Sequence, residues 1–166
     1  MSVEKKGDVY WMQEALTLAR QAGDEGEVPV GAIVVIDNNI VGQGFNQPIS
    51  SCDPTAHAEI IALRDAAKNI GNYRLVNATI YVTLEPCTMC AGAIVHSRVK
   101  RLIYGAKEPK AGAIESQAEL LRAPYINYRV EVEGGICEQE SSELISAFFT
   151  GRRAQQREQK KKEENE

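Results

Sequence analysis

Two short motifs hold the side chains in this sequence that are best suited to chemistry. The first is His57-Ala58-Glu59, and the second is Pro86-Cys87-Thr88-Met89-Cys90. Imidazole and thiolate are typical zinc ligands, whereas a glutamate transfers protons. The chain has two histidines and four cysteines, so few other residues could do this work. We therefore predict one zinc ion held by His57, Cys87 and Cys90.

A fourth protein ligand would close the site, whereas three ligands leave one position for water. His96 lies six residues after Cys90 on a predicted helix, a rotation of about 240°, so it points away from Cys90. Cys52 lies in a predicted loop five residues before His57, and its spacing does not exclude it. We favour three ligands and a water, with a closed structural site and a metal-free protein as the alternatives.

The two cysteines stand where a helix begins. Cys87 follows Pro86 at the end of a predicted strand, and Cys90 lies one turn into the next helix. A helix N-terminus carries partial positive charge and free N–H groups, which favour the metal-binding thiolate. Open α/β sheets also bind ligands beyond the carboxyl ends of their strands.

Glu59 is predicted to move protons. Residues 57 and 59 are about 200° apart on a helix, so both reach one site only if it lies off the helix N-terminus. Zinc lowers the pKa of its bound water to about 7 and so supplies hydroxide. Hydroxide attack on a carbon that bears an amino group requires protons at the ring nitrogen and at the leaving amine, which one carboxylate can deliver. The pattern predicts hydrolytic deamination; the alternative is a glutamate that merely stabilises the helix dipole.

The elements that position these residues alternate along the chain. Apolar periodicity predicts helices over residues 8–20, 55–68, 88–98 and 138–149, strands over 30–36, 40–46, 79–84, 101–106 and 129–132, and a short helix over 115–121. The strand-helix-strand unit over 79–106 should have parallel strands. Helices must cover both faces of the sheet, so the fold class is α/β, a three-layer α/β/α sandwich with a mixed sheet of about five strands.

Length and composition are those of one ordinary globular domain. The chain has 166 residues, 43% hydrophobic and 25% charged. No apolar run approaches the roughly 20 residues that span a bilayer, and no signal peptide is expected. The irregular cysteine spacing favours reduced cysteines in a cytosolic protein.

Charge is distributed unevenly. Residues 151–166 carry six of the 19 Lys/Arg and four of the 23 Asp/Glu. The rest of the chain therefore holds 13 Lys/Arg and 19 Asp/Glu. The body is therefore acidic and the C-terminal segment basic. A general nucleic-acid binder is disfavoured, and any nucleic-acid contact must be a local patch.

The H-x-E…P-C-x-x-C spacing resembles the zinc-dependent nucleobase deaminases. A longer match, over about residues 8–153, resembles the bacterial tRNA-specific adenosine deaminases. It lies in Val28–Ala32, Asn46, Asp53–Ile60, Asn72–Leu75, Tyr81–Cys87 and Met89–Ala93. The resemblance implies a cytidine deaminase-like fold, with residues 1–154 as the zinc-dependent deaminase domain and residues 155–166 as a charged, flexible tail.

The resemblance also implies an activity and partners. The expected protein is a cytoplasmic homodimer that converts adenosine to inosine at the wobble position of a tRNA anticodon, with an arginine tRNA as substrate and neither membrane nor DNA as partner. Each subunit would hold one zinc ion on His57, Cys87 and Cys90, with Glu59 as the proton shuttle.

Further residues carry over by position. Asn46 and the Ala58 N–H would contact the base, and Val30 and Leu84 would line its pocket; ordinary strand core is the alternative for the last two. The expected contacts to the anticodon loop are Lys107, Glu108, Lys110, Arg152 and Arg153, for which solvated surface is the alternative. Glu108 stands where the family is expected to have an aspartate, so a loop contact there is expected to be lost or shifted.

Two other functions are compatible with the motifs. A free-base or nucleoside deaminase, for guanine or cytosine, would enclose a small substrate and need no basic rim, whereas Arg152 and Arg153 favour the tRNA enzyme. A non-catalytic, zinc-stabilised binding module would be indifferent to Glu59→Gln.

Overall fold

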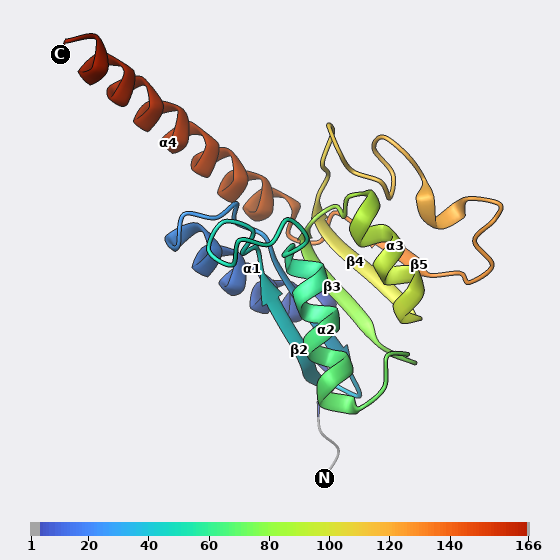
Figure 1. Ribbon diagram of the computed structural model, residues 1–166. Helices are drawn as coiled ribbons and strands as arrows, with labels where there is room; N and C mark the ends of the chain where they lie inside the picture. The colour runs from blue at the N-terminus through green and yellow to red at the C-terminus, as the bar shows by residue number, and fades with distance from the viewer. Residues whose placement is uncertain (1–3, 166) are drawn as a thin grey trace.

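A mixed five-stranded sheet forms the middle layer of the structure, a computed structural model that describes residues 4–165 (Figure 1). Its strands are β1 (Gly31–Ile36), β2 (Asn39–Phe45), β3 (Thr79–Leu84), β4 (Arg101–Ala106) and β5 (Glu131–Gly134), in the spatial order β2-β1-β3-β4-β5. β1 runs antiparallel to both β2 and β3, whereas β3, β4 and β5 are mutually parallel. The predicted strand-helix-strand unit with parallel strands is confirmed.

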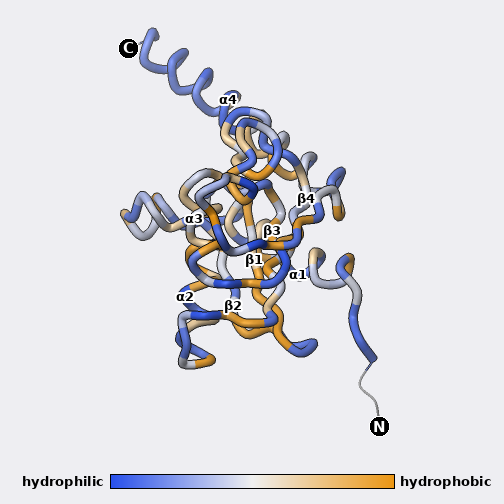
Figure 2. Tube along the Cα trace, turned by 90° about the vertical axis from the view of Figure 1, so that its right-hand side faces the viewer, coloured by the Kyte–Doolittle hydropathy of each residue, from blue (hydrophilic) through white to orange (hydrophobic). Residues whose placement is uncertain are grey.

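Two helices cover each face of the sheet. α1 (Asp8–Asp24) and α4 (Glu138–Glu164) pack on one face, and α2 (Ala58–Ile70) and α3 (Thr88–Ser97) pack on the other. The period of two along β1 divides its side chains between two cores: Ile33 faces α1 and Val34 faces α2 and α3. Figure 2 shows the apolar trace concentrated in these central layers. The predicted three-layer α/β/α sandwich is confirmed.

Helix α2, which carries the first chemical motif, lies unusually close to β2. A Cβ atom added to Gly44 would lie 2.7 Å from the Ala58 carbonyl oxygen and 2.8 Å from the Ala62 nitrogen. Glycine is therefore required there because any side chain would push the helix away from the sheet. This close packing fixes the height of the N-terminus of α2 above the strand.

Several predicted boundaries are wrong. α1 continues through Gly23 to Asp24, and the left-handed turn at Gly26 follows it. α2 begins at Ala58 rather than at residue 55, because Asp53 holds the preceding residues in a turn: its Oδ1 accepts the Thr55 N–H and hydroxyl at 2.8 Å.

The helix predicted over residues 115–121 is also wrong. Only a short 3-10 turn, η1 (Leu120–Arg122), forms there. Further along the segment, the N–H groups of Gln117 and Leu120 donate to the carbonyl oxygens of Gly112 and Ala113 rather than to acceptors four residues back. The N–H groups of Ile114, Glu115 and Ser116 are anchored on the carboxylate of Glu85, which lies outside the segment.

The C-terminal segment is helical without a break at the predicted domain boundary. α4 runs through residue 154 to Glu164, and its outer part projects from the body (Figure 1). The division into a domain of residues 1–154 and a flexible tail stays a prediction, and residues 1–3 and 166 lie outside the described range. None of the described helices is both long enough and apolar enough to cross a bilayer.

Candidate active site

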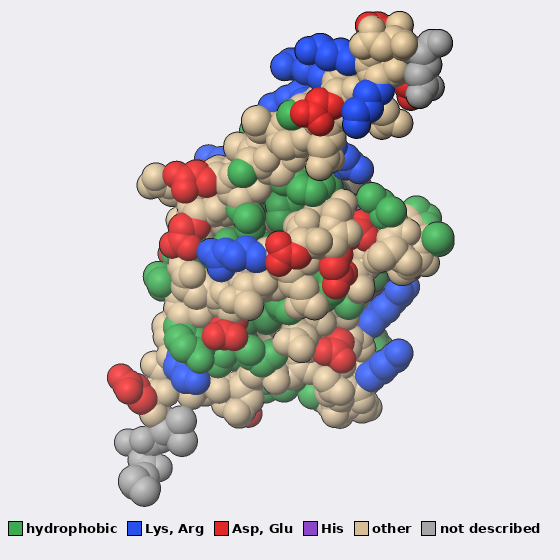
Figure 3. Space-filling view, turned by 90° about the vertical axis from the view of Figure 1, so that its left-hand side faces the viewer, with side chains coloured by type: hydrophobic (Ala, Val, Ile, Leu, Met, Phe, Trp, Pro, Cys, Tyr) green, Lys and Arg blue, Asp and Glu red, His purple; other side chains and the backbone are tan. Residues whose placement is uncertain are grey.

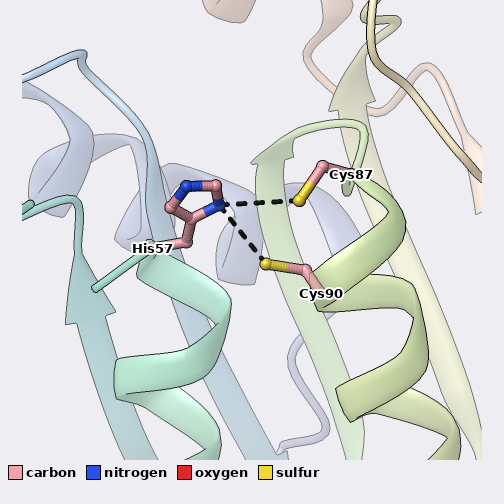
Figure 4. Close-up of side chains that lie close together, drawn as sticks. All are labelled: His57, Cys87 and Cys90. Carbon is pink, nitrogen blue, oxygen red and sulfur yellow. Dashed lines mark hydrogen bonds between the residues drawn. The ribbon is translucent and has the colours of Figure 1, made fainter. Parts of the chain in front are cut away.

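His57, Cys87 and Cys90 meet where two helices begin. His57 is the N-cap residue of α2, and Cys87 is the N-cap residue of α3 with Cys90 in its first turn. The Nδ1 atom of His57 lies 3.6 Å from each cysteine Sγ (Figure 4). The three ligand atoms all lie within 4.8 Å of one another, so the predicted ligand set is brought together.

The cluster has the dimensions that a zinc ion needs. Tetrahedral zinc with Zn–S bonds of about 2.3 Å and Zn–N bonds of about 2.1 Å requires N···S separations of about 3.6 Å. The observed N···S separations are 3.6 Å. The residues present therefore fit a zinc ion without rearrangement.

Neither alternative ligand joins the cluster. His96 is exposed and, with Tyr73 and Leu63, lines a hollow on the outer side of α2 and α3. Cys52 is exposed, with its Sγ 3.8 Å from the Ile49 carbonyl oxygen. Over residues 4–165, no fourth His, Cys, Asp or Glu completes the ligand set, so the prediction that His96 points away is confirmed.

The two thiols divide one proton unequally. Hydrogen bonds from Cys90 and His57 lower the pKa of Cys87 to about 3. The hydrogen bond to Cys87 and burial together raise the pKa of Cys90, which is fully buried. One thiolate is thus already present at neutral pH, and a bound Zn²⁺ would displace the second proton.

Glu59 lies in the first turn of α2, and only 4% of its surface is exposed. Burial raises the pKa of its carboxyl group, and this outweighs the lowering by nearby hydrogen bonds and by His57. Because Glu59 has no ion-pair partner among residues 4–165, helix-dipole stabilisation alone does not explain its burial. His57 and Glu59 both lie at the N-terminus of α2, as predicted, whereas a shared site and the shuttle role stay predictions.

Asn46 is fixed by the same helix end. The side-chain Oδ1 of Asn46 accepts the Ala58 N–H at 2.9 Å, and the backbone N–H of Asn46 donates to the Val30 carbonyl oxygen at 3.1 Å. The predicted base-contacting N–H of Ala58 is therefore already paired, and the Asn46 side-chain amide is held in one orientation. Val30 is 4% exposed and belongs to the core, while Leu84 is half-buried.

A groove of about 550 Å³ begins at Leu84 and runs between the loop after β4 and the helix α4. Of the residues predicted to contact RNA, the groove is lined by Lys107, Glu108, Lys110 and Arg153. Arg152 lies apart from them, 5.5 Å from the ring of Phe148, on the side of α4 that faces Glu27. The structure thus brings four of these five residues together around the groove.

Two buried carboxylates that the motifs did not single out hold the loops around this site. Glu85, 2% exposed, accepts the N–H groups of Glu108, Ile114, Glu115 and Ser116 at 2.9–3.1 Å, and also the Ser116 hydroxyl. Burial alone would raise the pKa of Glu85, but these hydrogen bonds outweigh it and lower the pKa. The sequence feature that could have indicated this role for Glu85 is its place directly between a buried strand and Pro86.

Glu27 does the same for the loop before α2. Its carboxylate is 1% exposed and accepts the N–H groups of Ile49 at 3.1 Å and Ser50 at 2.9 Å. Burial opposes ionisation, but these hydrogen bonds and the positive charge of Arg152 lower the pKa of Glu27 overall. The two loops that flank the cluster are therefore held in place by ionised, buried side chains.

Comparison with known proteins identifies the family. Residues 5–106 match the model of the cytidine and deoxycytidylate deaminase zinc-binding region. The tRNA-specific adenosine deaminase of Haemophilus influenzae is 53% identical over 93% of this chain and 90% of its own length. The enzyme of the same name from Bacillus subtilis is 42% identical over 86% and 88%.

Solved structures agree with these relatives. A chain from work on tRNA:A34 deaminases, which edit adenosine to inosine at the wobble position of transfer RNA, is 44% identical. It superposes with a TM-score of 0.79 over 81% of this chain and 98% of its own. Guanine deaminase from Bacillus subtilis is 39% identical, with a TM-score of 0.59 over 61% and 66%. The chain therefore belongs to the zinc-binding cytidine and deoxycytidylate deaminase family and, within it, to the tRNA-specific adenosine deaminases.

Proposed function

We propose that this chain converts adenosine to inosine at the wobble position of a tRNA anticodon, consuming one water and releasing ammonia. The expected substrate is an arginine tRNA with an ACG anticodon. The observation that carries this proposal is the juxtaposition of a zinc-sized cluster, the buried Glu59 and a groove with cationic side chains. A single-stranded loop can splay a base into such a site while its backbone lies along the groove.

Zinc held by His57, Cys87 and Cys90 would supply a water whose pKa lies near 7. Glu59 then takes a proton from the attacking water and delivers it to the ring nitrogen of the base. A second transfer by the same carboxyl group lets the amine leave as ammonia. Burial of Glu59 suits this work because bulk water does not compete for the transferred proton.

Base recognition is assigned to Asn46 and to the residues around it. The bond from Ala58 leaves the Asn46 Nδ2 group free to donate to an acceptor on the purine. Direct contact between the base and the Ala58 N–H requires the Asn46 amide to turn away first. Val30 and Leu84 are proposed to provide the apolar wall of the base pocket, with Leu84 at the entrance to the groove.

The anticodon loop is proposed to follow the groove. Lys107, Lys110 and Arg153 provide positive charge along it. Glu108 faces the same groove, and its Oε1 already accepts the Lys110 N–H at 3.0 Å, so it orders the loop as well as facing the RNA. Arg152 lies on the other side of α4, and we propose that it contacts the RNA backbone near Ser50.

We further propose a homodimer in the cytoplasm. An apolar hollow of about 390 Å³ lies on the outer surface of α2 and α3. It is lined by Ile60, Leu63, Ala67, Tyr73 and Ala93, and Tyr73 is 67% exposed. A self-complementary apolar patch is the usual basis of a two-fold dimer. Sedimentation equilibrium of the parent and of Tyr73→Glu tests this: only the parent should be dimeric.

The direct test is incubation with an arginine tRNA that has an ACG anticodon, followed by sequencing of the product. Inosine should replace the wobble adenosine. The likeness to guanine deaminase makes deamination of a free base the second candidate, so free guanine and cytosine are assayed for ammonia release. Ammonia from a free base with unchanged tRNA would reject the tRNA activity.

Glu59→Gln tests the shuttle. We expect the variant to keep its zinc and its circular dichroism spectrum but to lose turnover by about 10²-fold or more, the scale of general acid–base catalysis. Glu119→Gln, an exposed change of the same type, should retain parental turnover. Equal turnover in the Glu59 variant and the parent would indicate a zinc-stabilised binding module rather than this catalytic role.

A further inference from the structure

The outer part of α4 projects from the body beyond the part of the helix that packs on the sheet. The helix packs inward through Ser141, Leu144, Ile145 and Phe148, and Arg152 is the last residue that is partly buried. From Arg153 to Asn165 every residue is exposed, and the helix projects away from the sheet (Figure 1). This free segment contributes nothing to the core, so its charge pattern is not explained by folding.

The free segment has a cationic face that continues the wall of the groove. At about 100° per residue, Arg157 and Lys160 lie about 40° and 20° to either side of Arg153, and Phe149 lies about 40° away. Phe149 and Arg153 line the groove, so this face emerges from it. We call Arg153, Arg157 and Lys160 the tail face; Glu164 lies at its far end. Figure 3 shows Lys and Arg side chains gathered on the projecting end.

The tail face reaches well beyond the groove. Lys160 is seven residues past Arg153, a rise of about 10 Å along the helix axis. The body is acidic, with 19 Asp/Glu against 13 Lys/Arg outside residues 151–166. A polyanion held at the groove is therefore attracted along the tail face and repelled by much of the remaining surface.

We propose that the tail face binds phosphates of the double-helical stem next to the anticodon loop, an inference that rests on the proposed tRNA substrate. The groove takes the splayed loop, and the duplex that closes the loop must leave it. Double-stranded RNA is recognised mainly through its backbone and shape, and a row of cations on one face of a helix suits such contacts. The isolated segment is marginally stable as a helix in water, so these contacts also stabilise it.

A matched pair of substitutions tests the face. Lys160→Gln removes a charge from the tail face, whereas Lys162→Gln removes the same charge from the opposite side, about 160° from Lys160. Each variant is titrated with an anticodon stem-loop and with a single-stranded oligonucleotide of the loop sequence, between about 50 and 200 mM salt. Each lost phosphate contact should reduce the fall in affinity over this range by about threefold.

We expect Lys160→Gln to weaken binding of the stem-loop and to reduce the dependence of its affinity on salt. In the double variant Arg157→Gln with Lys160→Gln, the factor by which affinity falls between the two salt concentrations should be roughly tenfold smaller than in the parent. Binding of the single-stranded loop, and the single-turnover rate at saturating tRNA, should match the parent. Equal effects of Lys160→Gln and Lys162→Gln, no effect of either, or an equal loss with the loop oligonucleotide would each overturn the stem contact. If the parent fails to deaminate the tRNA, the proposed function itself is wrong. That outcome is distinct from a failure of the stem contact, which the binding titrations measure.

Discussion

Replacing Glu85 with glutamine should loosen the loop that forms one wall of the groove. Its Oε2 accepts three backbone N–H groups, and its Oε1 accepts the Glu108 N–H at 3.1 Å and the Ser116 hydroxyl. A glutamine oxygen in the Oε2 position keeps the first three bonds without charge. Its NH₂ group then faces the Glu108 N–H, and two donors are left against each other.

The magnitude follows from these bonds. Hydrogen bonds to a charged acceptor are worth about 1.5–3 kcal/mol and neutral ones about 0.5–1.5, so three weakened bonds lose about 3 kcal/mol together. One unsatisfied, buried N–H adds about 1–3 kcal/mol. Local opening of the loop relieves part of this, so we expect a loss of about 3 kcal/mol in the free energy of unfolding.

Urea unfolding at neutral pH, followed by circular dichroism, measures this loss. Glu119→Gln is the control because its ion pair with Arg122 is exposed and worth about 0–1 kcal/mol. Zinc content should remain at one ion, since Glu85 contacts none of the three ligands, while the Kd for the tRNA should rise. An unfolding midpoint equal to that of the parent would refute the reasoning from hydrogen bonds.

The pH dependence of the same variant has a definite sign. The pKa of Glu85 is lowered from 4.5 in the folded protein, so its contribution is fully present above pH 4.5 and is lost as the pH falls through the folded pKa. The difference between parent and Glu85→Gln should therefore be constant from neutral pH to about 5 and shrink below about 4.5. A difference that grows on acidification would contradict an ionised Glu85.

Two further perturbations examine the metal cluster and the helix that holds it. After zinc is removed with a chelator, iodoacetamide should alkylate Cys87 before Cys90, because Cys87 has a pKa of about 3 whereas Cys90 is buried with a raised pKa. Peptide mapping by mass spectrometry determines the order of alkylation. Modification of Cys90 before Cys87 would contradict this assignment. Gly44→Ala should lower the free energy of unfolding by about 1–3 kcal/mol and weaken zinc binding, because the added Cβ lies 2.7 Å from the backbone of α2. Gly151→Ala lies in α4, where nothing is near the added Cβ, so this variant should instead raise the free energy of unfolding by about 0.5–1 kcal/mol. Thermal unfolding of both variants measures the contrast. Equal shifts of the two melting temperatures would count against the close-packing explanation.

The residues that make the metal site could be predicted because their geometry is local. Cys87 and Cys90 are one helical turn apart, and β3 and β4 have bounds equal to those predicted. For His57 and Glu59, helix rotation supplied the condition that a shared site must lie off a helix N-terminus, although His57 itself is the non-helical N-cap residue of α2. The joining of the two motifs, about 30 residues apart, was predicted from their ligand types and supported by the family resemblance, and not from periodicity.

The conformation of the loop after β4 depends instead on contacts distant in sequence, which no periodicity reveals. Residues 115–121 have a helical pattern, yet Glu85, about 30 positions earlier, anchors their first N–H groups, and the N–H groups of Gln117 and Leu120 donate to Gly112 and Ala113 rather than four residues back. A Cβ on Gly112 would lie 2.4 Å from the Glu85 carboxyl carbon. The loop can therefore close around the Glu85 side chain only because Gly112 has no side chain of its own. Because Glu85 lies directly before Pro86, the strand that delivers Cys87 to the metal also fixes the wall of the groove. One buried carboxylate at the end of β3 therefore holds the loop after β4 close to the strand end that carries Cys87.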